Sequence, residues 1–178
     1  LTTAQVTALS STQLQALTSA QIKAIEVADV AALTATQLNK LSTLQVQALT
    51  TAQLVALTTA QIEALTTAQV AALTTAQVVA LEVTDVAALT AAQVVGLTTA
   101  QAGVLTSAQM AALTVDQIAV LQAADLAAVS TAAIASLTTA QVAVLSAGQI
   151  AALKTAQVAA LETADLAALS AEQIVAMS

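Results

Sequence analysis

Residues 65–80 read LTTAQVAALTTAQVVA, which is one eight-residue unit followed by a near copy of itself. Written in eights from Leu1, the whole chain aligns with this unit without insertion or deletion. The 178 residues make 22 full repeats, and Met177 and Ser178 begin the next one. With the positions named a to h, the consensus is Leu-Thr-Thr-Ala-Gln-Val-Ala-Ala. A short fixed period of this kind is typical of solenoids and other repeat architectures.

Five positions of the unit vary little along the chain. Position a is Leu in 20 repeats, b is Ser or Thr in 17, and e is Gln in 17 and Asp in four. Position f is Val, Ile or Leu in 20 repeats, and h is Ala in 16. Positions c and g vary most, so we expect them to face solvent. We predict a single repeat array over residues 1–178, cut as a window from a longer array.

The composition narrows the class of protein. The chain is 58% hydrophobic, yet it contains no Phe, Trp, Tyr, Cys or His, and its formal net charge is −7. This charge argues against nucleic-acid and anionic-lipid partners, which need a basic patch. A Gln or Asp interrupts the apolar residues in every repeat except the one that contains Ala133. We therefore expect no transmembrane segment, because a spanning helix needs about 20 mostly apolar residues in a row.

Two of the three architectures that could carry an octapeptide repeat fit poorly. In one continuous helix each Leu would lie about 80° further round than the last, so no fixed apolar face would form. Coiled coils need a repeat near 7 or 11 residues. A β-solenoid suits Thr and Val, but its turns need Gly, Asn or Asp at a fixed position. Glycine occurs only at Gly96, Gly103 and Gly148. The β-solenoid remains the alternative fold.

The third architecture is a chain of very short helices, and the sequence marks where each one begins. Ser or Thr at b followed by Gln at e has the capping-box spacing, in which each side chain bonds the backbone N–H of the other residue. We predict helices that run from c through the next a, about seven residues each. Because such helices are too short to be stable alone, they must pack the face that carries positions f and a against neighbouring helices. The predicted fold is an all-α solenoid with two to four helices per turn, a number that the sequence does not fix.

The acidic residues support these helix starts, since acids favour the first turn of a helix. Nine of the ten lie at b, d or e. Where e is Asp, b is never Ser or Thr. The four b/e pairs are Glu26 with Asp29, Glu82 with Asp85, Gln122 with Asp125, and Glu162 with Asp165. One hypothesis is a carboxylate pair that binds calcium. The other is a variant cap, in which Asp accepts from backbone amides.

Catalytic and cofactor chemistry finds no candidate residues. Three lysines, ten scattered acids and many equivalent hydroxyls make no acid–base or nucleophilic constellation. No His, Cys or Tyr could serve as an axial haem ligand, and Met110 at f is expected to be core. We expect no enzyme activity, no catalytic site, no cofactor and no metal.

The hydroxyl rows at b and c are the surface feature that suggests function. We expect capping at b. For the exposed hydroxyls at c we consider O-glycosylation, in which glycans would be attached to the candidates Thr51, Thr59, Thr67 and Thr75. A second hypothesis is ice binding, in which evenly spaced Thr methyls and hydroxyls match a lattice.

The run of residues 49–64, LTTAQLVALTTAQIEA, and its copies resemble octapeptide arrays in very large bacterial surface proteins. Those proteins are often labelled as exported haem-utilisation or adhesion proteins. The resemblance covers the whole chain and implies an extracellular or cell-surface protein of the adhesin-stalk or filament kind. It supplies no site residues, and the haem part of the label finds no support in this sequence.

These observations lead to a mechanical prediction. We expect an extracellular bacterial fibre or adhesin stalk that associates with itself into filaments or stacks end to end, because neither terminal repeat is atypical. The alternative is a lattice-binding module that recognises ice or a polysaccharide through its Ser/Thr rows. A designed repeat protein is a third hypothesis, although the drift at Ala133 and Gly148 is more typical of a natural sequence.

Overall fold

A computed structural model describes residues 2–177. Within this range every regular element is a short α-helix, one to each repeat, and no strand is present. The helices fall into two compact units that divide after Leu89. This arrangement confirms the predicted all-α solenoid. It contradicts both alternative architectures, the β-solenoid and the single continuous helix.

Unit 1 contains α1 (Thr3–Thr7), α2 (Ser11–Gln15), α3 (Ser19–Lys23), α4 (Val27–Ala31), α5 (Ala35–Asn39), α6 (Thr43–Ala48), α7 (Thr51–Val55), α8 (Thr59–Glu63), α9 (Thr67–Ala72), α10 (Thr75–Ala80) and α11 (Val83–Ala88). Unit 2 contains α12 (Ala91–Val95), α13 (Thr99–Ala102), α14 (Ser107–Ala112), α15 (Val115–Val120), α16 (Ala123–Ala128), α17 (Thr131–Ile134), α18 (Thr139–Ala143), α19 (Ala147–Ala152), α20 (Thr155–Val158), α21 (Thr163–Ala167) and α22 (Ala171–Val175).

Each helix begins where the capping-box spacing predicts. The residue at b is the N-cap and has an extended backbone, with φ −70° and ψ 156° at Thr66 before α9. The first helical residue is at c, which is Thr67 in this repeat. The extended N-cap separates one helix from the next and gives the chain a change of direction in every repeat.

The helix ends differ from the expectation. The helices have four to six residues, not seven, because each ends at f, g or h and the residue at a lies outside the helix. Leu73, after α9, has φ −57° and ψ 137°, and its N–H donates to the carbonyl of Val70 at 3.1 Å. The next N-cap, Thr74, must itself be extended, so the backbone has to leave the helical region before it.

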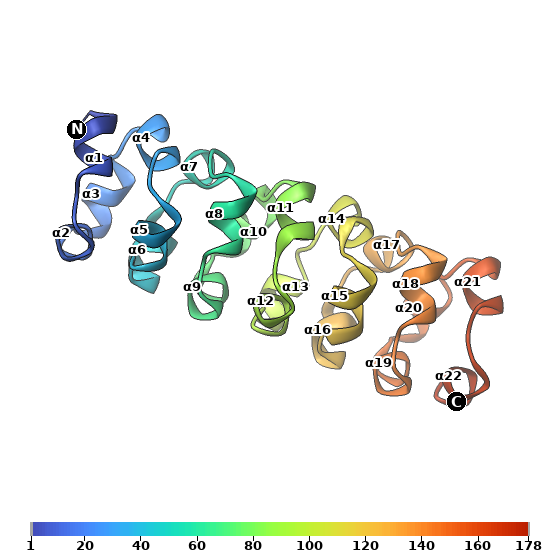
Figure 1. The fold of residues 1–178 in the computed structure, drawn as a ribbon. Coiled ribbons are helices and arrows are strands. Elements are labelled where there is room, and N and C mark those ends of the chain that lie inside the picture. Colours follow the sequence, from blue (N-terminus) through green and yellow to red (C-terminus); the bar gives the residue numbers. More distant parts are fainter. Residues whose placement is uncertain (1, 178) are drawn as a thin grey trace. The chain divides into compact units, whose positions relative to one another are not determined.

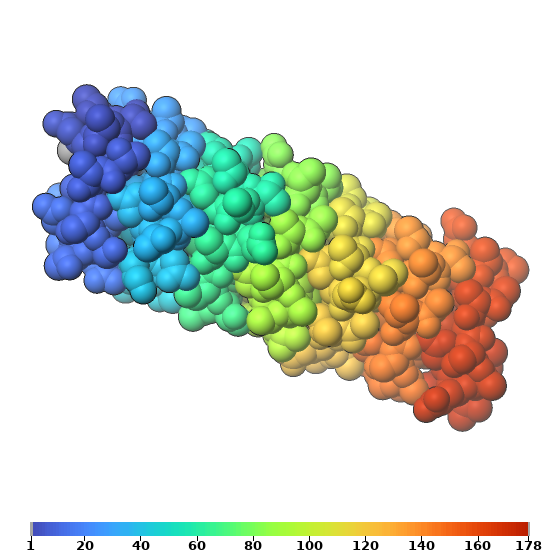
Figure 2. All heavy atoms as spheres, viewed as in Figure 1, coloured from blue at the N-terminus to red at the C-terminus, as the bar shows by residue number. Residues whose placement is uncertain are grey.

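Packing joins each helix to the one three positions further along the chain. In unit 1, α3 contacts α6, α6 contacts α9, and α8 contacts α11. In unit 2, α13 contacts α16 and α16 contacts α19. Figure 1 shows the helices of each unit stacked as successive turns, and Figure 2 shows these turns as consecutive bands on the visible face of each unit.

The core of each unit consists of the f and a side chains, as predicted. Val70 at f is fully buried, and Leu73 at the following a is 5% exposed. Position c faces solvent, as at Thr67, while Ala71 at g is partly covered. Burying one such apolar side chain contributes about 1.5–3 kcal/mol, which is how stacked turns can be stable without aromatic residues. Within residues 2–177 no helix is long or apolar enough to cross a membrane.

Candidate functional site

The contact between successive turns is the one polar arrangement that recurs throughout the units, and it begins with the capping box. In α9 the N–H of Thr66 donates to Oε1 of Gln69 at 2.8 Å, and the N–H of Gln69 donates to Oγ1 of Thr66 at 3.1 Å. The same reciprocal pair is present in every described helix whose repeat has Ser or Thr at b and Gln at e. The predicted capping box is confirmed.

The amide nitrogen of the same glutamine has a second role, which the sequence analysis did not predict. Nε2 of Gln69 donates to the carbonyls of Leu38 at 2.8 Å and Leu41 at 2.7 Å, both on the preceding turn. Gln69 is 2% exposed, so these bonds lie inside the unit. Its oxygen thus fixes a helix start while its nitrogen holds the end of an earlier helix.

Equivalent cross-turn bonds recur in both units. The donors to carbonyls 28 and 30 or 31 residues earlier are Gln37, Gln45, Gln53, Gln61 and Gln77 in unit 1, and Gln141, Gln149, Gln157 and Gln173 in unit 2. A spacing of 28 residues is three and a half repeats. This spacing, with packing between helices three positions apart, places between three and four helices in each turn.

Aspartate at e makes a different bond, because a carboxylate has no hydrogen to donate to those carbonyls. Instead, one carboxylate oxygen accepts from a threonine hydroxyl at c, 26 residues earlier on the preceding turn. The bonds from Oγ1 to Oδ1 are Thr3 to Asp29 at 2.7 Å, Thr99 to Asp125 at 2.7 Å, and Thr139 to Asp165 at 2.8 Å. Thr59 occupies the corresponding position for Asp85, and its hydroxyl lowers the pKa of that carboxyl. All four aspartates are 3% exposed.

The sequence contains a signal for this pairing, but the signal can be recognised only when the number of residues in one solenoid turn is known. Threonine occupies 11 of the 22 c positions, yet it is present three repeats before every Asp at e. Gln122, which precedes Asp125 at b, replaces the lost amide donor: its Nε2 donates to the carbonyl of Val95 at 2.9 Å.

Burial affects the ionisation of Asp85. Removal of this carboxyl from water raises its pKa above the ordinary value of 3.8, and the nearby charge of Glu82 raises it further. The hydroxyl of Thr59 and the backbone of Glu82 oppose the shift by bonding to the charged form. The net pKa is raised, so burial outweighs the hydrogen bonds at this position.

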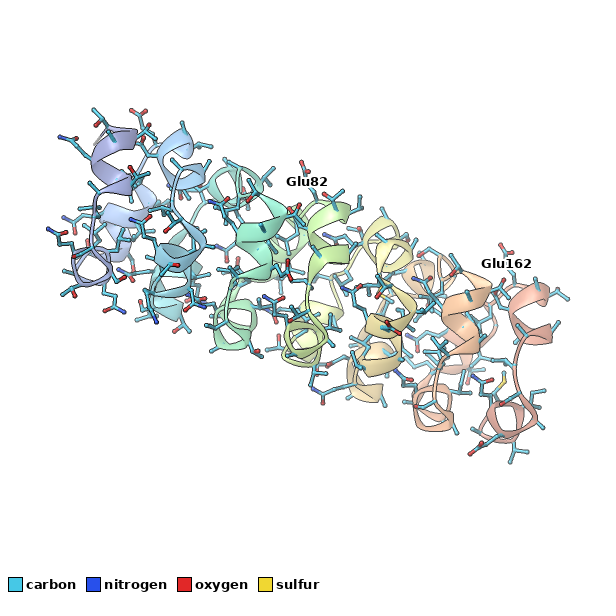
Figure 3. All side chains as sticks on the ribbon, in the orientation of Figure 1. Glu82 and Glu162 are labelled. Atoms are coloured by element: carbon cyan, nitrogen blue, oxygen red, sulfur yellow. The ribbon has the colours of Figure 1, made fainter. Side chains whose placement is uncertain are left out.

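The two members of a b/e pair lie in different surroundings. Glu82 and Glu162 project outward from the ribbon (Figure 3), and both are exposed while their partners Asp85 and Asp165 are buried. Within residues 2–177 no group of three or more acidic side chains could hold a metal ion.

The variant-cap bond is present in one of the four pairs, Glu162 with Asp165. Oδ2 of Asp165 accepts from the N–H of Glu162 at 3.1 Å. Oδ2 of Asp29 and of Asp125 has no hydrogen-bond partner. In those two repeats the bond to threonine is therefore the main contact of the carboxylate.

The threonines proposed for glycosylation all lie on the surface. Thr51, Thr59, Thr67 and Thr75 are each the first residue of a helix and are exposed. The hydroxyl of Thr59 faces the carboxyl of Asp85 and lowers its pKa. Within the described residues, the hydroxyls of Thr51, Thr67 and Thr75 engage no other side chain. Thr51, Thr67 and Thr75 are therefore the better acceptors among the candidates.

Stacked turns of capped helices, joined by side-chain amides that bond to carbonyls of the preceding turn, define a helical solenoid of the repeat-protein class. The chain belongs to the ALTTAQ repeat family, whose repeat matches residues 22–59, 51–83, 78–115 and 118–155. These matches together cover well over half of the chain. Comparison with curated proteins and with solved structures gives no match.

Proposed function

We propose that this chain is a structural spacer, a segment of an extracellular bacterial fibre or adhesin stalk, and not an enzyme. The observation that carries the proposal is the sameness of the contact between turns. Neighbouring repeats use the same capping box and the same glutamine-to-carbonyl bonds, as at Gln69 and Gln77. Such an array provides many equivalent surfaces and adds length with every turn.

The arrangement favours a spacer over a lattice-binding module. A surface that matches ice or a polysaccharide needs the same side chain in every turn. The b hydroxyls are used in caps, and the c row alternates Thr with residues such as Val27, Ala35, Val83 and Ala91. Aspartates also engage part of the c row, as at Thr99, whose hydroxyl donates to Asp125. A uniform row of free hydroxyls is therefore not available.

Small-angle X-ray scattering tests the mechanical role. A globular protein of this length has a radius of gyration of about 16 Å. A spacer should give a clearly larger value, and a concatemer of two copies should increase it nearly in proportion to length. A radius near the globular value for both proteins would contradict the proposal.

Location and glycosylation need separate measurements on native material. We expect surface-exposed chain in intact cells of the source organism, detected by immunogold labelling and by cleavage with an external protease. We expect mass spectrometry to find hexose-type additions at Thr51, Thr67 or Thr75. Protection of the chain in intact cells would contradict the extracellular role, and unmodified threonines would contradict the sugar coat alone.

A further inference from the structure

We propose that the contact between α13 and α16 fixes the register of unit 2, that is, which repeat packs on which. This register contact consists of Thr99 and Gly103 on one turn with Asp125 and Ala128 on the next. The two helices pack on each other within unit 2, and Figure 1 shows α16 one turn after α13. The inference goes beyond the spacer role and does not depend on cellular location.

The ordinary contact between turns is the same for every repeat and therefore carries little information about register. Nε2 of Gln149 donates to the carbonyls of Ile118 and Leu121, and these acceptors are backbone groups that each repeat supplies. If one repeat looped out, the pairing would move by eight residues. The same glutamine would then find equivalent carbonyls, and equivalent apolar side chains would meet at f and a.

The bond between α16 and the preceding turn differs, because it needs a particular side chain on that turn. Oγ1 of Thr99 donates to Oδ1 of Asp125 at 2.7 Å. Asp125 is 3% exposed and its Oδ2 has no hydrogen-bond partner, so the buried carboxyl depends on this one hydroxyl. In a pairing one repeat earlier, Ala91 would replace Thr99 and offer no hydrogen. Burial of a carboxyl without a donor is costly.

The glycine of the register contact restricts the pairing in both directions. A Cβ at Gly103 would lie 3.2 Å from the carbonyl oxygen of Ala128, which is closer than Cβ atoms usually approach. Val95 and Ala111 occupy the equivalent position one repeat earlier and one repeat later, and both have a Cβ. Position g is Gly in this repeat alone, so only this repeat combines Thr at c with room for that carbonyl.

The repeat of α13 is therefore the one that satisfies α16 on both counts. The repeat before it lacks the hydroxyl and adds a Cβ. The repeat after it has a hydroxyl at Ser107 but adds the Cβ of Ala111. A buried polar group that pairs in only one way fixes register in coiled coils, and Asp125 has the same effect here. The register contact thus opposes the looping out of a repeat between α13 and α16.

Removal of one repeat between the two halves of the register contact tests the inference in the 178-residue chain. Deletion of residues 113–120 keeps the period of eight and all the glutamine-to-carbonyl contacts that follow it. It moves α16 onto α12, so Asp125 faces Ala91 and the carbonyl of Ala128 faces Val95. The chain then has a buried carboxyl without its donor and a Cβ where the glycine was.

The matched control removes one repeat of unit 2 outside the register contact. Deletion of residues 145–152 leaves α13 and α16 unchanged, and Asp165 keeps a threonine partner because Thr131 takes the place of Thr139. We expect the chain without residues 113–120 to melt roughly 5 °C or more below this control. Thermal denaturation followed by circular dichroism measures the difference.

A rescue variant shows whether the difference arises from register. Ala91→Thr with Val95→Gly gives α12 the two features that α16 requires. In the chain without residues 113–120 we expect this pair to recover most of the lost melting temperature, or to restore a cooperative melt if none is left. In the full-length chain the same pair should give no gain, because Val95 is exposed in a helix that Gly disfavours. Equal melting temperatures of the two deletions, or a deletion of residues 113–120 that the pair does not improve, would overturn the proposal.

Discussion

The smallest unit of this fold is one glutamine side chain that serves two turns at once. The oxygen of Gln69 satisfies an N–H at a helix start, and its nitrogen satisfies carbonyls at the end of an earlier helix. These are the groups that a short helix leaves without internal partners. Because each helix has only four to six residues, its unpaired ends make up most of its backbone. The amide at e is therefore more important here than in an ordinary helix.

Replacement of this amide should be costly only where both of its roles exist. We expect Gln69→Ala to lower the free energy of unfolding by about 2–4 kcal/mol, because a cap is lost and buried carbonyls lose their donor. Gln13→Ala loses only the cap bond, since Gln13 is exposed, and should cost about 1 kcal/mol. Urea denaturation of the two variants gives the difference, and equal losses would contradict the cross-turn role.

Replacement of the buried carboxyl should stabilise the chain. In Asp85→Gln the consensus amide returns, and its nitrogen can reach carbonyls 28–31 residues earlier. We expect the free energy of unfolding at neutral pH to rise by about 1–2 kcal/mol. Asp116→Gln is the control, because Asp116 is an exposed acid in the first turn of α15 and should give no gain.

The same variant should change the pH dependence. Burial raises the pKa of Asp85 above its unfolded value of 3.8, so the folded chain holds that proton more tightly. The contribution of Asp85 to stability is therefore greatest below pH 3.8 and declines as pH rises through the folded pKa. Thermal melts across this interval should show a decline in the unmodified chain that is smaller in Asp85→Gln. Parallel profiles in the two proteins would contradict the assignment.

At the scale of the helix, small differences between repeats show how closely the turns pack. α13 and α17 carry smaller residues than the other repeats have at three positions: Ala102 at f, Gly103 at g and Ala133 at e. A Cβ at Gly103 would lie 3.2 Å from the carbonyl oxygen of Ala128. The three substitutions fit a closer local approach, and Ser136 bonds across it to the carbonyl of Ser107 at 2.9 Å.

Two glycines should respond in opposite ways to alanine. Gly148→Ala restores the consensus residue inside α19 and brings Cβ only to 3.9 Å from Ser146 Oγ, so we expect a gain of about 0.5–1 kcal/mol. Gly103→Ala forces Cβ against backbone and should lose about 1–3 kcal/mol. Thermal denaturation shows whether each substitution raises or lowers the stability of the chain. A stabilised Gly103→Ala would show that the turns are not closely packed there.

At the scale of the molecule, the repeats of one unit should be exchangeable so long as the period of eight is kept. Deletion of residues 65–72 removes one whole repeat and moves each later helix onto an equivalent partner. Asp85 would then lie three repeats after Thr51 in place of Thr59, and so would keep a threonine partner. We expect a cooperative thermal transition and a modest loss of stability.

Deletion of residues 65–71 should be far more damaging, although it removes fewer residues. It moves every later residue by one position relative to the earlier turns, so apolar side chains no longer meet. We expect loss of the cooperative melt and of much of the helical circular dichroism signal. Similar melts for the seven- and eight-residue deletions would contradict the stacked-turn architecture.

The parts of the structure that could be predicted are those fixed by neighbours in sequence. Ser or Thr at b and Gln at e locate each helix start, because the capping bonds span three residues. The burial of the side chains at f and a could also be predicted, because residues three apart lie on the same face of a helix. The number of helices per turn, the glutamine bonds to the preceding turn and the pairing of Thr99 with Asp125 join residues 26–31 apart. A repeat of identical units gives no reason to choose one long-range pairing over another.

The octapeptide by itself determined that the backbone leaves the helix in every repeat, which residues cap each start, and which side chains are buried. Those features depend on bonds within one repeat. Only the tertiary structure decided that each helix packs on the one three positions away, that the e amide is shared between turns, and that Asp at e needs Thr at c. These features depend on how far the chain turns at each extended residue, such as Leu73 and Thr74. The sum of those turns is set by close packing of the helices within each unit.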